Sequence, residues 1–144
     1  MTEQSATEKY EFSFKVPFEI EITSEKIEDI LCSAFEGGST YWANPMYDID
    51  VIIDDEYLYL DLTGLYSWEI PLYKFGVIYF TELMDKGTED EQCHFLTYNT
   101  LISGAKTMAQ KYPRHFRDWI NGHDDSITAD VYLQCCLFGE IVYG

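Results

Sequence analysis

The residues of this chain that could support catalysis are scattered rather than grouped. The three histidines are His94, His115 and His123, and none has the spacing of a metal-ligand set. His123 and Asp124 form a lone His-Asp pair, whereas a metal-dependent phosphohydrolase needs further histidines in fixed patterns. The sequence contains no glycine-rich phosphate loop, nucleophile elbow or HExxH motif. We therefore predict that the protein is not an enzyme and has no catalytic residues.

Two other groups of side chains have metal-binding chemistry without the pattern for it. Asp54, Asp55 and Glu56 are consecutive carboxylates that could hold Ca²⁺ or Mg²⁺, yet they lack the spaced oxygen ligands of a dedicated loop. The cysteines show no CxxC spacing, and zinc needs several ligands that converge. They are Cys32, Cys93, Cys135 and Cys136. We expect a solvated turn at the carboxylates, reduced structural cysteines, and neither a metal nor another cofactor.

Four of the nine basic residues fall within one segment, 106–117. Lys111, Arg114 and Arg117 are three residues apart, which puts them on one side of a short helix if Pro113 does not interrupt it. Arginine recognises phosphate and aromatic rings stack on bases, so an anion-binding pocket is one interpretation. The other interpretation is that these cations offset an otherwise acidic surface.

Charge is the strongest signal in the composition, with 26 acidic and 9 basic residues and a net charge of −17. Such a surface repels nucleic acid and anionic membranes, because phosphate contacts need lysine and arginine, and it attracts basic protein surfaces. Solubility alone is the competing explanation. The acidic residues that we expect to face a basic partner are Glu11, Glu19, Glu21, Asp48, Asp50, Asp54, Asp55 and Glu56.

The elements that would position these residues begin after a tail at 1–8, and we expect a single domain over 9–144. Apolar and polar residues alternate over 10–22, which predicts a long strand with one buried face. Pro17 cannot donate to a strand ladder, so this strand lies at an edge or bends there. An apolar stripe over 27–35 predicts a helix that ends in two left-handed glycines.

The middle of the chain is predicted to contain short strands and one helix. In order, we expect a loop at 39–45, a hairpin of strands 47–53 and 56–63, a short strand at 67–70, a helix over 72–84 that begins at Pro71, and a solvated loop at 86–92.

The second half of the chain is predicted to be mostly helical. An apolar stripe over 101–109 and two further helices, at 114–120 and 127–138, are followed by a last strand at 140–144. Strands first and helices later indicate an α+β fold with a mostly antiparallel sheet, amphipathic helices packed on one face and a helical second half. No stretch approaches the roughly 18 apolar residues that span a bilayer.

The segments EGGSTYW, from Glu36 to Trp42, and TADVYLQCCLFGEIVYG, from Thr128 to Gly144, are the most distinctive strings of the sequence. They resemble a group of small bacteriophage and prophage proteins with an EGG-x-x-YW turn and an LFGEIVYG-like C-terminus. MAQKYPRHF at 108–116 resembles the same pattern less closely. The resemblance brings no catalytic residues. It implies a phage accessory gene whose product, with its polar N-terminus, acts in the cytoplasm of a bacterial host cell.

Three hypotheses about function remain open. The first is an acidic phage-encoded interaction protein that inhibits a host nucleic-acid-binding or defence protein through its negative surface. The second is a small-molecule binding protein, such as a sponge for a nucleotide signal. Its ligand-binding residues would be Ser39, Thr40, Tyr41, Trp42, Asn44, Lys111, Arg114 and Arg117. The third is a virion structural or assembly protein that forms a homo-oligomer. Charge and resemblance favour the first, with a basic host protein as partner and no direct contact with nucleic acid or membrane.

Overall fold

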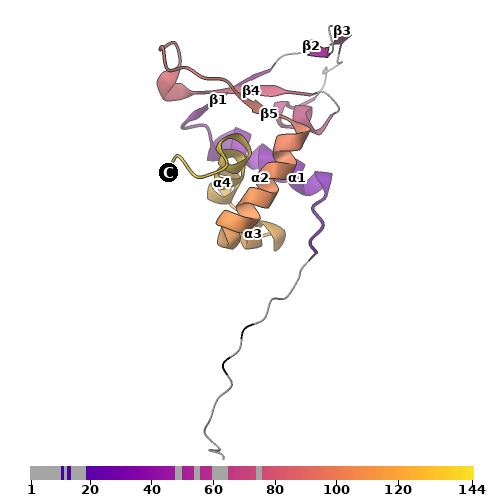
Figure 1. Ribbon diagram of the computed structural model, residues 1–144, viewed down its shortest axis with the longest axis vertical. Coiled ribbons are helices and arrows are strands. Elements are labelled where there is room, and N and C mark those ends of the chain that lie inside the picture. Colours follow the sequence, from indigo (N-terminus) through magenta and orange to yellow (C-terminus); the bar gives the residue numbers. More distant parts are fainter. Residues whose placement is uncertain are drawn as a thin grey trace, which may run out of the picture.

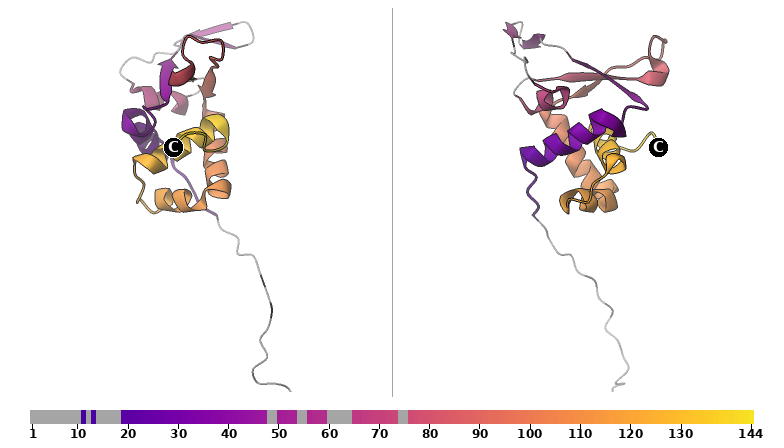
Figure 2. Two further views of the ribbon diagram at one scale, coloured as in Figure 1. Left: turned by 90° about the vertical axis from the view of Figure 1, so that its left-hand side faces the viewer. Right: turned by 180° about the vertical axis from the view of Figure 1, so that it is seen from behind.

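The computed structural model describes residues 11, 13, 19–47, 50–53, 56–59, 65–73 and 76–144, and for 44–47, 50–53 and 56–59 it describes the backbone alone. Within these residues the helices form one layer, and a small antiparallel sheet lies across one end of that layer (Figures 1 and 2). The protein therefore has the α+β fold, the antiparallel pairing and the helical second half that the sequence predicts.

The helices begin and end close to their sequence signals. They are α1 (Ser24–Ser33), α2 (Tyr98–Lys111), α3 (Pro113–Ile120) and α4 (Ser126–Phe138). The Thr23 hydroxyl accepts a hydrogen bond from the Lys26 N–H at 3.3 Å and caps α1. Asp125 caps α4 in the same way, and Gly139 ends it with a φ of 72°. Such a left-handed C-terminal residue favours glycine because a Cβ would be strained there.

Helix α4 is the centre of the hydrophobic core. Nine consecutive residues, Thr128 to Cys136, are buried, so it has no solvated face over that length. It packs against α1, α2, α3 and strand β5 (His94–Leu96). The approach of α2 is close because a Cβ added at Gly104 would lie 2.3 Å from the Cys136 sulfur. A glycine at that position therefore sets the distance between the two helices.

The larger sheet has the order β1 (Ala43–Tyr47), β4 (Ile78–Glu82) and β5, with every pair antiparallel. Its buried apolar residues, Ala43, Ile78, Phe80 and Leu96, belong to the hydrophobic core. A separate two-stranded sheet joins β2 (Asp50–Ile53) to β3 (Glu56–Tyr59), which confirms the predicted hairpin. Two 3-10 segments, η2 (Ser67–Leu72) and η3 (Leu83–Asp85), connect the strands.

The prediction of a helix over 72–84 is wrong. That segment contains β4, and within it Ile78 and Phe80 are buried while Tyr79 between them is only partly buried. Thr81 is buried as well, so burial along β4 does not follow a strict period of two, and an apolar run of this length is hard to tell from a helix. The short strand expected at 67–70 is instead the η2 turn, and the loop expected at 39–45 already contains the first three residues of β1.

Three predictions about the chain ends and glycines also need correction. Residues 19–22 belong to no strand, and most of the predicted strand at 10–22 lies outside the described residues. Residues 140–144 form no strand either. The glycines after α1 lie in a π-helical extension, η1 (Ala34–Gly38), and neither has a positive φ. Gly38 serves a different purpose, since a Cβ there would lie 2.5 Å from the backbone oxygen of Ser126.

Candidate functional site

The two distinctive sequence segments meet in one buried polar network around Asp130 of α4. Asp130 is 7% exposed, and its carboxylate accepts hydrogen bonds from four side chains. Oδ1 accepts from the Ser39 hydroxyl at 2.8 Å and from Trp42 Nε1 at 2.7 Å. Oδ2 accepts from the Tyr41 hydroxyl at 2.6 Å and from Gln134 Nε2 at 3.0 Å. Both carboxylate oxygens are therefore saturated, as a buried charge requires.

Gln134 extends this network to the end of the chain. Its side chain is fully buried, and its Nε2 also donates to the backbone oxygen of Tyr143 at 3.1 Å. Its Oε1 accepts from the backbone N–H groups of Val142 and Tyr143, both at 2.8 Å. The Tyr143 ring stacks on the Trp42 ring with centroids 5.2 Å apart. The Gln134 side chain thus makes the hydrogen bonds to the backbone of Val142 and Tyr143 that a neighbouring strand would make in a sheet. The C-terminal residues are held in this way without forming a strand.

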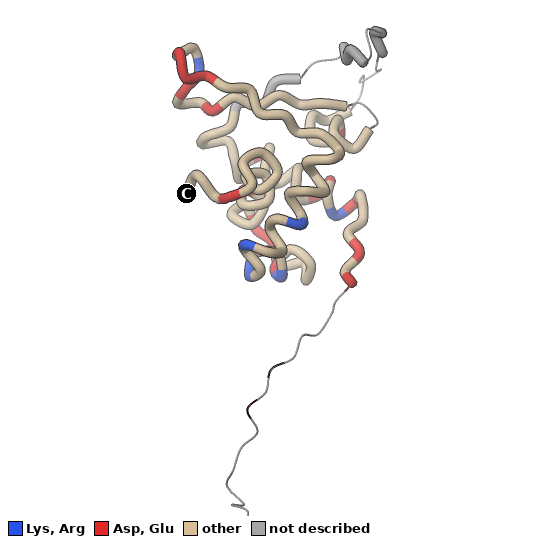
Figure 3. The backbone as a smooth tube through the Cα atoms, in the orientation of Figure 1, with Lys and Arg blue, Asp and Glu red and all other residues tan. Residues whose placement is uncertain are grey.

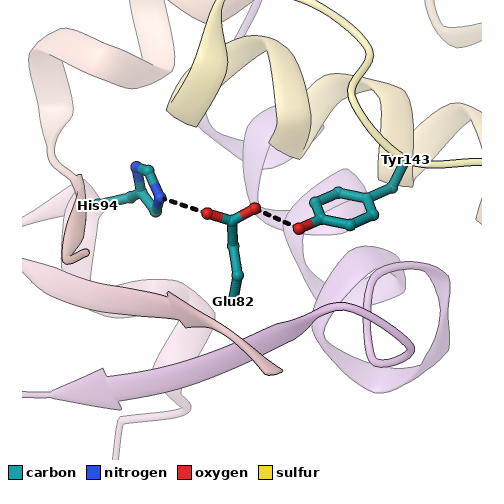
Figure 4. Close-up of polar contacts among 3 residues, drawn as sticks. All are labelled: Glu82, His94 and Tyr143. Atoms are coloured by element: carbon teal, nitrogen blue, oxygen red, sulfur yellow. Dashed lines mark hydrogen bonds and ion pairs between the residues drawn. The ribbon is translucent and has the colours of Figure 1, made fainter. Parts of the chain in front are cut away.

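A second polar group joins the C-terminal segment to the sheet (Figure 4). The Glu82 carboxylate at the end of β4 accepts a hydrogen bond from the Tyr143 hydroxyl. Its other oxygen lies 3.2 Å from His94 Nε2 in β5, within hydrogen-bond distance. The hydrogen bond to Glu82, followed by burial, raises the pKa of Tyr143 to about 12.

The hydroxyl groups of Tyr41 and Tyr143 connect parts of the chain that are far apart in the sequence. Burial, followed by the hydrogen bond to Asp130, raises the pKa of Tyr41 to about 12. Tyr41 is about half exposed, and its hydroxyl donates a part-buried hydrogen bond to Asp130. Both tyrosines stay protonated near neutral pH, and both oxygens of Asp130 are occupied, so these three side chains are not placed to accept a proton.

Beside the network is a half-open pocket of about 350 Å³. Tyr41 lines it from the first distinctive segment, and Ile141 and Tyr143 line it from the second. His115 of α3 also contributes, and its Nδ1 is buried with no hydrogen-bond partner among the described residues. Of the predicted ligand-binding residues this pocket includes Tyr41, and it includes none of the basic group Lys111, Arg114 and Arg117.

Several of the predicted ligand-binding residues make hydrogen bonds within the fold. Ser39 and Trp42 are buried in the Asp130 network, and the Thr40 hydroxyl donates to the Gly37 backbone oxygen at 3.1 Å. The side chain of Asn44 lies outside the described residues. Only Tyr41 lines the pocket.

The basic group on α2 and α3 does not form a single row. Pro113 begins a new helix, so Lys111 lies on α2 while Arg114 and Arg117 lie on α3. Lys111 donates to the Gly139 backbone oxygen at 2.8 Å, at the C-terminal end of α4, where a cation is favourable. Arg114 and Arg117 are exposed and make no ion pair with a described residue.

The predicted acidic surface is only partly described. Glu11, Glu19 and Glu21 are exposed. Asp50 and Glu56 begin the β2 and β3 strands, but their side chains are not described. Asp48, Asp54 and Asp55 lie outside the described residues. The structure shows a further acidic group that the sequence analysis treated as a solvated loop, the β4–β5 connection with Asp85, Glu89, Asp90 and Glu91.

The described residues contain no group of three or more side chains that could hold a metal ion. The cysteines are free, and Cys135 and Cys136 are buried in α4. Burial raises the pKa of Cys135 to about 11, so its thiol stays protonated and unreactive. No helix of the described chain is long and apolar enough to cross a membrane.

The residues that sequence reasoning missed are Asp130, Gln134, Tyr143, Glu82 and His94. One signal was available for the first two: they lie four residues apart in an otherwise apolar helix, which marks a buried polar pair that needs partners. Comparison with protein-family models, with curated proteins and with solved structures finds no match for this chain.

Proposed function

We propose that this chain is an acidic interaction protein of phage origin that inhibits a host nucleic-acid-binding or defence protein by covering its basic surface. The observation that carries the proposal is the separation of charge. The β4–β5 connection groups four acidic side chains and one lysine, Lys86, at one end of the described chain, whereas four of the six described basic residues lie on α2 and α3 (Figure 3). Such a separation orients the molecule as it approaches a basic partner.

The acidic connection also presents apolar contact area. Met84 is 79% exposed and Leu83 is 41% exposed, and both follow β4 directly. Burial of an exposed methionine in a partner's pocket supplies affinity, while carboxylates of the same connection supply orientation and on-rate. Neither residue has a packing role in the described fold that would require it to be apolar.

The connection is held in one shape by its own hydrogen bonds. The Glu91 carboxylate accepts from the Gly87 N–H at 2.8 Å, and the Thr88 hydroxyl donates to the Asp85 backbone oxygen at 2.7 Å. At its base, the Leu83 N–H donates to the Trp42 backbone oxygen at 2.8 Å. A preorganised loop loses less conformational entropy on binding than a flexible one does.

A pull-down from nuclease-treated bacterial lysate at low and high salt, read by mass spectrometry, tests the proposal. We expect one basic protein that is retained at low salt and released at high salt. A triple variant with Asp85, Glu89 and Asp90 changed to their amides should lose it.

The matched control is Glu11, Glu19 and Glu21 changed to Gln, which removes the same charge from the N-terminal region. If the control loses the partner and the connection variant keeps it, the partner binds the N-terminal acidic residues that the sequence predicts and not the β4–β5 connection. If wild-type protein retains no basic protein at either salt concentration, the proposal is wrong.

A small-molecule binding protein is the second candidate, favoured by the pocket that Tyr41 and His115 line together. A volume of about 350 Å³ falls within the range of known ligand sites. A thermal-shift screen of nucleotides tests this reading, since a ligand that binds only the folded state raises Tm. Stabilisation that is lost in His115→Ala would support it, and no shift with any nucleotide would remove it.

A further inference from the structure

A second cavity lies on a different part of the molecule from both sites described above. It is an open groove of about 400 Å³ between the segment that leads into α1, helix α2 and the side chain of Phe116 in α3. Its walls are mainly aliphatic, and they include Ile22, Ile27, Leu101 and Ala109. At its mouth Ile20 is 49% exposed and Ile102 is 39% exposed. This is apolar area that water contacts in the free protein, and its burial would be favourable.

The charge of the groove is opposite to that of the whole protein. Acidic residues outnumber basic ones 26 to 9 in the chain, yet no Asp or Glu is among the described residues that line the groove. Its one charged lining residue is Lys106, which is exposed and makes no ion pair or hydrogen bond with a described residue. The hydroxyl groups of Ser24 and Tyr98 supply the remaining polar side chains of the lining.

We propose that this groove binds a small amphipathic monoanion, a carboxylate with an unbranched apolar tail. The aliphatic walls take the tail, and the Lys106 ammonium pairs with the carboxylate at the rim. The volume lies within the range of about 300–1,000 Å³ that small-molecule sites occupy. A nucleotide does not fit this chemistry, because several phosphates would meet one lysine and an apolar wall.

The two parts of the ligand make different contributions. Most of the affinity comes from the tail, since each buried methylene adds apolar area removed from water. An ion pair at an exposed rim is weak, so loss of the Lys106 charge should weaken binding by only about twofold to fivefold. The lysine therefore gives preference for an anion over a neutral molecule with the same tail.

Isothermal titration calorimetry of the full chain with decanoate, and separately with decanol, tests the proposal below the concentration at which either aggregates. Ala109→Phe fills the groove from a partly exposed position on α2. Lys106→Gln removes the rim charge, and Lys86→Gln removes the same charge from the exposed β4–β5 connection. A Tm measurement shows whether each variant is folded. If Ala109→Phe does not fold, Lys106→Gln still tests the proposal, because it changes only an exposed side chain.

We expect decanoate to bind at one site more tightly than decanol, Ala109→Phe to abolish binding, and Lys106→Gln alone of the two lysine variants to weaken it. Absence of saturable binding to wild-type protein overturns the proposal. So does binding that a folded Ala109→Phe variant leaves unchanged, because the ligand then lies elsewhere. Equal affinity for decanoate and decanol, or an equal effect of the two lysine variants, shows that the groove does not select an anion.

Discussion

Replacement of Asp130 by Asn tests whether the buried network stabilises the fold. The change is nearly isosteric, so it removes a charge and one acceptor oxygen without opening a cavity. If the amide oxygen stays with Ser39 and Trp42, the amide nitrogen faces the Tyr41 hydroxyl and Gln134 Nε2. The tyrosine hydroxyl can turn to accept a hydrogen bond. Gln134 cannot, because two backbone N–H groups hold its own oxygen in place.

The expected cost follows from this count. A hydrogen bond to an ionised group contributes about 1.5–3 kcal/mol, and a buried donor left without an acceptor costs about 1–3 kcal/mol. In Asp130→Asn the remaining hydrogen bonds become neutral and one donor of Gln134 loses its acceptor. Relief from burying a charge offsets part of the loss. We therefore expect the free energy of unfolding to fall by about 3 kcal/mol.

Urea unfolding at neutral pH, followed by tryptophan fluorescence, measures this change because Trp42 belongs to the network. Glu140→Gln is the matched control, since Glu140 is exposed and makes no hydrogen bond with a described side chain. A surface change of this kind should fall within about 0.5 kcal/mol of wild type. If Asp130→Asn is no less stable than Glu140→Gln, the network does not stabilise the fold and our account of the two segments is refuted. Should Asp130→Asn fail to fold, Ser39→Ala removes a single donor and keeps the test usable.

Three further changes probe separate parts of the structure. The hydrogen bond to Glu82 raises the pKa of Tyr143 from 10.0 to about 12, so this tyrosine stabilises the fold below pH 10 and loses that contribution as pH rises toward 12. In urea unfolding at alkaline pH, Tyr143→Phe should therefore reduce the fall in the free energy of unfolding between pH 10 and 12. An unchanged slope against pH would count against the hydrogen bond. Asp125→Ala should lower the free energy of unfolding by about 1 kcal/mol through loss of the α4 cap. The pKa of Asp125 is lowered by its hydrogen bond to the Thr128 backbone N–H. The loss of stability in Asp125→Ala should therefore be full above the ordinary carboxylate pKa and should shrink as pH falls through the lowered pKa. Equal losses of stability at neutral and acid pH would contradict the charged cap. Gly104→Val should lower Tm, or prevent folding, because its side chain would collide with Cys136, and a Tm equal to wild type would show that α2 can shift away.

The sequence predicted the helices well because their signals are local. α1 and α4 each combine a capping side chain with an apolar run, and both lie within a few residues of the backbone they stabilise. The strand β4 was mistaken for a helix because a short apolar run after a proline has two readings, and only its tertiary contacts choose between them. The prediction of a strand at 140–144 was wrong because the Gln134 side chain, and not a neighbouring strand, bonds to the backbone of this segment.

The polar network could not be predicted in the same way, because Ser39 and Asp130 are 91 positions apart. Their meeting nonetheless explains why the two distinctive segments have no catalytic motif. Each supplies half of a set of buried hydrogen bonds, and neither half is satisfied alone. The network also fixes the base of the acidic β4–β5 connection, through the backbone of Trp42 and the Tyr143–Glu82 hydrogen bond. Loss of Asp130 should therefore disturb partner binding as well as stability, whereas a change at Met84 should weaken binding and leave stability unaltered.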